Sequence, residues 1–185
     1  LWEEAARVTG EPCLALDWAE AVPVGATGPF FYLFLNSNTF GEAMQTAAQH
    51  TALLRQAVDL KYEADADGAR IWWRWPRGFD GPYTQASAFS AALFVLRARL
   101  ITAPDWTPVR VELQGEPLHC ANRARWLFGP DIVYRAPRNA IHVDAETAVR
   151  PIGQADPRMR HILQSISNTL ITSANGTAPF ATEVQ

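Results

Sequence analysis

The sequence lacks long apolar runs and has few cysteines, and both absences exclude classes of protein. No stretch approaches about 18 uninterrupted apolar residues, so we expect no transmembrane helix, and no signal peptide is recognisable. The 185 residues contain two cysteines, Cys13 and Cys120, too few for a disulfide scaffold. We therefore expect two reduced thiols, one or both of them buried, with a regulatory disulfide as the alternative.

The sequence also lacks the short motifs that carry catalysis or hold metals. It contains no G-x-S-x-G, no phosphate-binding loop and no G-x-G-x-x-G. No C-x-x-C, H-x-x-x-H or H-E-x-x-H spacing is present either. Asp65 and Asp67 lack the other ligand positions of a calcium loop. We therefore predict a protein that is not an enzyme and that needs no metal or cofactor.

The charge balance is acidic rather than basic. The 16 Lys and Arg residues are scattered among 19 Asp and Glu residues, for a formal net charge of −3. A self-sufficient DNA-binding domain usually carries a clustered basic surface. We therefore expect that this chain alone does not bind duplex DNA specifically. The composition is otherwise typical of a folded domain, with 48% hydrophobic and 19% charged residues.

Periodicity and turn signals predict an alternation of helices and strands. Apolar residues at helical spacing predict helices over 1–9, 14–21, 40–57, 84–101, 119–128 and 157–170. Apolar runs of strand length predict strands over 30–35, 60–64, 69–75, 109–113, 132–135 and 140–143. Turn residues at 65–68 and 137–139 each predict a β-hairpin between the flanking strands.

Two helix starts have recognisable capping residues. Thr39 and Glu42 have the T-x-x-E spacing of a capping box, in which the Thr hydroxyl accepts from a first-turn N–H and the Glu reaches back. Asp156 precedes Pro157, which suits an N-cap followed by a first-turn proline.

The order of the elements suggests a repeated unit. Residues 30–75 and residues 109–143 each follow the order strand, helix, strand, strand. We therefore predict an α+β fold, an antiparallel sheet built from two strand-helix-strand-strand units with covering helices. The alternative is a cupin-like β-sandwich with added helices, against which the three long helical patterns count.

Short motifs also follow one another along the whole chain in a distinctive order. They are LWEEAA (1–6), TGEP (9–12), NSNTFGEA (36–43), PVRV (108–111), LFG (127–129) with VY (133–134), NAI (139–141), PI (151–152) and ADP (155–157). In order and spacing this set resembles the N-terminal ligand-binding, arabinose-binding-like domain of AraC-family transcription regulators, in the branch of the ornithine-utilisation and virulence regulators.

The resemblance implies a cytoplasmic bacterial regulator whose sensing part is this chain. Residues 1–172 would bind a small-molecule effector, and residues 173–185 would form a linker. The linker would lead to a C-terminal DNA-binding domain with two helix-turn-helix units, which this chain lacks and through which alone DNA would be contacted. The regulator is a possible homodimer without membrane contact. The alternative function is a ligand-free dimerisation or scaffold module.

Two aromatic segments, residues 30–32 and 72–75, are the candidate ligand site. Aromatic side chains dominate small-molecule pockets because they offer rigid apolar area, although the same rings could simply fill a core. Arg125 belongs to a basic concentration with Arg123, Arg135 and Arg138 that suits an anionic ligand group or, alternatively, surface ion pairs. The predicted ligand-binding residues are Phe31, Tyr32, Trp72, Trp73, Arg74, Trp75 and Arg125.

Overall fold

The computed structural model describes residues 1–26, 28–54, 59–75 and 83–176. Its helices are α1 (Trp2–Thr9), α2 (Leu14–Ala21), α3 (Pro29–Leu35), α4 (Phe40–Leu54), α5 (Thr84–Arg99), α6 (Ala121–Phe128), α7 (Ala145–Val149) and α8 (Pro157–Gly176). Its strands are β1 (Asp59–Ala64), β2 (Gly68–Arg74), β3 (Arg110–Glu112), β4 (Ile132–Val133) and β5 (Asn139–Asp144).

The strands form one sheet in the order β1-β2-β5-β3-β4, antiparallel except for the β3–β4 pair. Ile71 lies opposite Tyr62 on one side and Ile141 on the other, and Val111 continues this apolar row. The α+β fold class with a mostly antiparallel sheet and covering helices is therefore confirmed. The β1–β2 hairpin is confirmed as well, and the Asp65 carboxylate closes its turn by accepting from Gly68 N–H at 3.2 Å.

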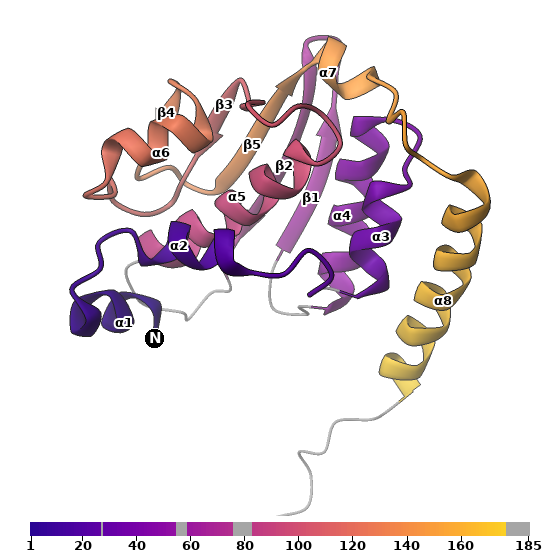
Figure 1. The fold of residues 1–185 in the computed structure, drawn as a ribbon, viewed down its shortest axis with the longest axis horizontal. Helices are drawn as coiled ribbons and strands as arrows, with labels where there is room; N and C mark the ends of the chain where they lie inside the picture. The colour runs from indigo at the N-terminus through magenta and orange to yellow at the C-terminus, as the bar shows by residue number, and fades with distance from the viewer. Residues whose placement is uncertain (27, 55–58, 76–82, 177–185) are drawn as a thin grey trace, which may run out of the picture.

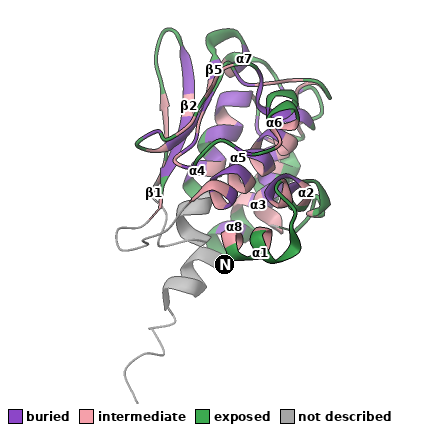
Figure 2. Ribbon diagram, turned by 90° about the vertical axis from the view of Figure 1, so that its left-hand side faces the viewer, coloured by how far each residue is buried: buried purple, intermediate pink, exposed green. Residues whose placement is uncertain are grey.

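The helices lie in layers on one face of the sheet. Helices α4 and α5 pack next to the strands, and α2 and α3 pack on these two helices in turn. Figure 2 shows the strands at one side and α4 and α5 behind them, with no described helix on the opposite side of the sheet. Because side chains alternate along a strand, Ile71 and Trp73 enter the core whereas Trp72 and Arg74 lie on the uncovered face.

The predicted strand over 30–35 is wrong, because this segment is helix α3. The leading element of the first predicted unit is therefore a helix. A short apolar run has the same hydrophobicity in a buried helix as in a buried strand. Pro29 at the first helical turn was the signal for a helix, since its fixed φ suits that position. Phe31 and Phe34 are buried and Tyr32 is exposed, as expected of a helix with one covered face.

The predicted hairpin between 132–135 and 140–143 is also wrong. Both strands exist, but β3 lies between them in the sheet, and β4 pairs with β3 in parallel after the α6 crossover. The segment that follows β4 crosses the end of β3, where Arg135 N–H donates to Gly115 O and Ala136 N–H donates to Leu113 O. The buried Asn139 side chain accepts from Gln114 N–H at 2.9 Å and fixes the start of β5.

The expectation of two reduced thiols is wrong in this structure, which joins Cys13 and Cys120 in a disulfide. Their Cα atoms are 6.0 Å apart, within the usual range for a disulfide, although 107 residues separate them in sequence. Helices α2 and α6 meet here, and Arg123 on α6 forms ion pairs with Asp17 and Glu20 on α2. The sequence held no signal for this contact.

The predicted helix caps are present, one of them in altered form. Asp156 accepts from Arg158 N–H at 2.8 Å at the start of α8. Thr39 Oγ1 accepts from Glu42 N–H at 3.2 Å at the start of α4. The Glu42 carboxylate reaches back to Asn38 N–H rather than to the N–H of Thr39 itself.

We predict that Thr39→Ala lowers the free energy of unfolding by about 1 kcal/mol, because a first-turn N–H of α4 loses its acceptor. The midpoint of urea unfolding, at unchanged slope, measures this effect. Thr169→Ala is the matched control. Thr169 is exposed inside α8 and its hydroxyl donates to Ser165 O, so its removal should be neutral or slightly stabilising. Equal effects of the two substitutions would refute the capping role of Thr39.

Candidate functional site

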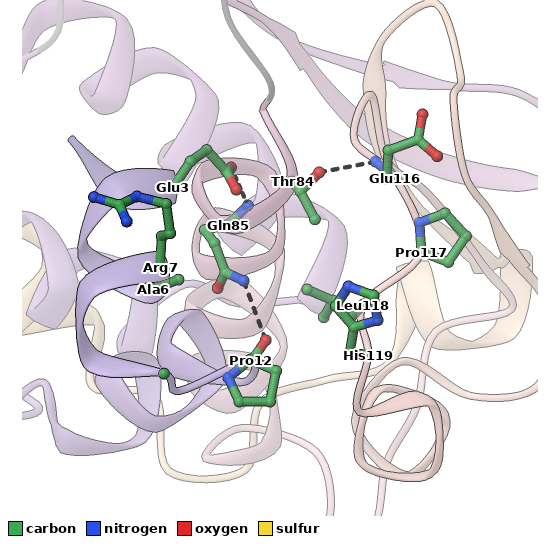
Figure 3. A pocket seen from close by; sticks show the side chains of 11 residues that line it. Glu3, Ala6, Arg7, Pro12, Thr84, Gln85, Glu116, Pro117, Leu118 and His119 are labelled. Atoms are coloured by element: carbon green, nitrogen blue, oxygen red, sulfur yellow. Dashed lines mark hydrogen bonds between the residues drawn. The ribbon is translucent and has the colours of Figure 1, made fainter.

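A pocket of about 370 Å³ lies between α1, the N-terminus of α5 and the segment that precedes α6. Figure 3 shows α1 on one side, Gln85 and Thr84 behind, and the segment from Glu116 to His119 on the other side. The pocket is lined by Glu3, Ala6, Arg7, Gly10, Pro12, Thr84, Gln85, Glu116, Pro117, Leu118 and His119.

The buried side chain of Gln85 holds the turn between α1 and α2 against α5. Its Oε1 accepts from Ala15 N–H at 3.0 Å, and its Nε2 donates to Pro12 O at 3.1 Å. One amide therefore satisfies a donor and an acceptor of a segment about 70 residues earlier. The buried Gln85 amide would destabilise the fold if it lost these partners. The two hydrogen bonds therefore hold the turn in the position where Pro12 lines the pocket.

Two further contacts close the pocket around the N-terminus of α5. The first N–H groups of a helix have no partner within it, and the Glu3 carboxylate on α1 accepts from Gln85 N–H at 2.7 Å. On the other side, Thr84 Oγ1 accepts from Glu116 N–H at 3.0 Å. A Cβ atom at Gly115 would lie 2.4 Å from Thr84 Cα, so only glycine allows this close approach.

The lining carries charges of both signs. Arg7 forms an ion pair with Glu4, and Arg135 forms an ion pair with the pocket residue Glu116. The hydrogen bonds from Arg135 keep the pKa of the Glu116 carboxyl below its usual value. Arg7, whose pKa the hydrogen bonds to Glu4 raise, and Glu116 are therefore charged at neutral pH, and Glu3 and His119 lie beside them in the lining. This arrangement suits a polar ligand that carries charge.

The predicted residues Trp72 and Arg74 lie away from this pocket, on the uncovered face of the sheet. Trp72 is only 7% exposed there because cations of other side chains cover its ring. Arg138, Lys61 and Arg74 lie 4.9, 5.4 and 5.5 Å from the ring centroid, and Trp72 Nε1 donates to Glu63 at 2.8 Å. Contacts of this kind between cations and indole faces are favourable.

The predicted residues Trp73 and Trp75 lie on the other face, toward α5. Trp75 Nε1 donates to the buried Ser87 Oγ at 3.2 Å, and its ring stacks on Tyr83. Trp73 is buried, and its Nε1 has no hydrogen-bond partner among the described residues. Alternation along β2 thus separates the four aromatic and cationic residues of the predicted site into two pairs.

The remaining predicted residues lie in other layers. Helix α3 packs on α4 and α8, so Phe31 and Tyr32 are remote from β2 in the layering. Phe31 stacks on Phe34 and lies under the Arg97 guanidinium. Tyr32 is exposed, as is Arg125 on α6. The structure therefore does not bring the seven predicted residues together in one place.

Sequence reasoning missed every residue of the pocket. The α1 side lies about 70 residues or more before α5, and the facing segment lies 32 residues after Thr84, and none of these segments carries a recognisable binding motif. The signal that could have been used is the polar Glu-Pro-Leu-His segment at 116–119, since binding residues often lie on loops positioned by a rigid scaffold.

Among the described residues, no group of three or more His, Cys, Asp or Glu side chains could hold a metal ion. Within the same ranges, no helix has the length and apolar character needed to cross a membrane.

Residues 1–152 match the family described as the arabinose-binding domain of AraC transcription regulator, N-terminal. The chain belongs to this family. The match contains the whole pocket, both faces of the sheet and the disulfide. The family is a regulatory domain of transcription regulators rather than an enzyme family. No curated protein matches the chain.

The fold of this AraC-type domain is similar to that of a solved regulator. The crystal structure of transcriptional regulator CdpR from Pseudomonas aeruginosa superposes with a TM-score of 0.71, at 16% identity over 89% of this chain. The chain spans only 55% of the length of that protein's chain. The likeness shows a shared fold.

We predict that Gln85→Ala lowers the free energy of unfolding by about 2 kcal/mol, because it leaves the buried Ala15 N–H without its acceptor. Urea unfolding measures this effect. Gln154→Ala is the control, since Gln154 is exposed and its Nε2 makes a single hydrogen bond to Leu100 O. A loss at position 85 no larger than at position 154 would contradict the role given to Gln85.

Proposed function

We propose that this domain senses a small-molecule effector in the pocket between α1, α5 and segment 115–119, and thereby controls a DNA-binding domain that follows in the full-length regulator. The observation that supports this most directly is a pocket lined by charged, polar and apolar residues, with walls from three separate segments. Its volume of about 370 Å³ lies in the range of small-molecule sites. An effector that binds two arrangements of these walls with different affinity would shift their populations.

The lining favours a polar, charged effector over an apolar one. Glu3 and Arg7 lie on the α1 side, and Glu116 and His119 lie on the facing segment. Each side thus offers a carboxylate that can bind a cationic group and a side chain, Arg7 or His119, that can donate a hydrogen bond to an anionic group. A small molecule with groups of both signs would satisfy both sides at once.

The aromatic residues remain a second candidate location within the same sensor function. Trp73 and Trp75 lie together toward α5, and the buried Trp73 Nε1 lacks a partner among the described residues. A buried donor without an acceptor is uncommon and calls for an explanation. An acceptor atom of an effector would supply one.

We extend the proposal to the whole regulator on the motif resemblance. The regulator would belong to the branch of the ornithine-utilisation and virulence regulators and would act in the cytoplasm. Residues 1–172 would form the sensing domain and residues 173–185 the linker, of which residues 173–176 continue helix α8 and residues 177–185 lie outside the described ranges. DNA would be contacted only by the helix-turn-helix domain.

We predict that His119→Ala abolishes the thermal stabilisation given by the effector while it barely changes the melting temperature of the free domain. The effector would be found by mass spectrometry of material released from the purified domain and by a thermal-shift screen of metabolites. His161→Ala is the control, because His161 is exposed on α8, away from the pocket.

The same experiment distinguishes the two locations. Trp73→Phe and Trp75→Phe keep the ring volume and remove the indole N–H. If these variants lose the stabilisation and His119→Ala keeps it, the effector binds at the aromatic residues. If no metabolite stabilises the domain and none is released from it, the sensor function is wrong.

A specific observation also supports the alternative function, dimerisation. Met159, Ile162 and Ile166 on α8 are 45–54% exposed and follow one another at helical spacing. They form an apolar stripe beside the buried residues that pack α8 on α3. Exposed stripes of this kind often mark a contact with a second helix. We propose that two copies of the chain associate through this stripe.

We predict that Ile162→Arg makes the domain monomeric, because it places a charge inside the proposed helix contact. Ser165→Arg introduces the same side chain on α8 outside the stripe and should leave association unchanged. Sedimentation equilibrium over a range of concentrations measures both variants. A wild-type domain that is monomeric at high concentration would exclude dimerisation through α8.

A further inference from the structure

The disulfide joins two segments that face each other across the pocket. Pro12 lines the pocket immediately before Cys13, and His119 lines it immediately before Cys120. Apart from this bond, α5 is the support that both segments share, through Gln85 on one side and Thr84 on the other. The bond is therefore the direct covalent connection between two walls of the pocket.

The local structure suits chemistry at sulfur. Cys13 is the N-cap of α2 and Cys120 is the N-cap of α6, each a helix of eight residues. The positive end of a helix stabilises a thiolate placed there. Both cysteines are only partly buried, and the adjacent residues Pro12 and His119 are exposed. The bond therefore lies near the surface, where a small thiol can reach it.

The two sulfur atoms are not equivalent. The first turn of α6 contains no acidic residue, and Arg123 lies in it. The first turn of α2 contains Asp17, which opposes the positive end of that helix. We expect a thiolate to be better stabilised at Cys120 than at Cys13 for this reason. In thiol–disulfide exchange the sulfur that better stabilises negative charge leaves faster.

We propose that Cys13 and Cys120 form a thiol–disulfide exchange site whose partner is a small or protein dithiol. The thiolate of the dithiol attacks Cys13 Sγ, the bond between the two protein sulfurs breaks, and Cys120 leaves as the thiolate. The second thiol of the reductant then attacks the mixed disulfide and releases Cys13. In total two electrons and two protons pass from the dithiol to the two cysteines, and the dithiol becomes a disulfide. The reverse sequence with an oxidised dithiol forms the bond again.

Exchange at this site alters how firmly the pocket walls are held. Without the bond, α2 and α6 remain connected by the ion pairs of Arg123 with Asp17 and Glu20. These pairs are partly exposed and therefore weak. Segments 10–13 and 116–120 gain freedom on reduction, which changes the population of the arrangement that binds an effector. This consequence for effector affinity rests on the proposed sensor function, whereas the exchange chemistry does not.

The chemistry is tested on the folded chain with reduced and oxidised dithiothreitol as the dithiol couple. After equilibration at a series of ratios, free thiols are labelled with a maleimide and counted by mass spectrometry. We expect a two-electron transition between zero and two labels while circular dichroism shows a folded domain throughout. A bond that is reduced only after urea unfolds the domain would overturn the proposal, and so would thiols that stay reduced at every ratio.

Rates of alkylation and hydrogen exchange test the asymmetry and the consequence for the pocket. In the reduced domain, limiting iodoacetamide should label Cys120 severalfold faster than Cys13, and equal or inverted rates would refute the assigned order of attack. Amide exchange in segments 10–13 and 116–120 should be severalfold faster in the reduced domain. The double variant Cys13→Ser, Cys120→Ser should show the same exchange in both buffers.

Unchanged exchange in the wild type would show that the bond does not control the pocket walls. None of these measurements uses an effector. Their failure would therefore leave the thermal-shift test of the sensor function intact, and failure of that test would leave the exchange site intact.

Discussion

The hydrogen bonds of the Gln85 side chain are the contact on which the architecture of the pocket depends. Helix α5 lies against the sheet and is largely apolar, with Ala88, Ala91 and Val95 fully buried. At its N-terminus, Gln85 receives the turn between α1 and α2. A buried amide requires both a donor and an acceptor, and this turn supplies both. The pocket is the space that remains when α1 is held there and the segment before α6 is held by Thr84.

The two faces of the sheet differ in what covers them. The covered face packs Ile71, Trp73 and Ile141 against helices and supplies stability through buried apolar area. The uncovered face carries Trp72, whose ring is covered by cationic side chains rather than by a helix. Adjacent tryptophans of one strand thus have different environments. The pocket uses neither face, because it lies between α1, the N-terminus of α5 and the segment that precedes α6.

The chain belongs to a family of regulatory domains, and this membership bears on how the pocket walls are held. The proposed sensing of an effector would require a change of arrangement for a few kcal/mol of binding energy, so the site is expected in contacts weaker than those of the core. Here the walls are held by a small number of hydrogen bonds, by the exposed ion pair of Glu116 with Arg135 and by one covalent bond between Cys13 and Cys120. Helix α8, which leads to the C-terminal end of the chain, packs on α3 at the opposite edge of the helical layer.

The sequence by itself determined the fold class, the β1–β2 hairpin and the starts of helices α4 and α8, because these depend on local periodicity, turn residues and capping oxygens such as that of Thr39. It also carried the motifs of the family. It did not determine that 30–35 is a helix, since apolarity alone does not separate a buried helix from a buried strand. Only the tertiary structure decided that β3 separates β4 from β5, that Cys13 meets Cys120, and that Glu3 and His119 line one pocket. Each of these contacts joins segments that are distant in sequence or depends on packing among several elements, so no local pattern encodes it.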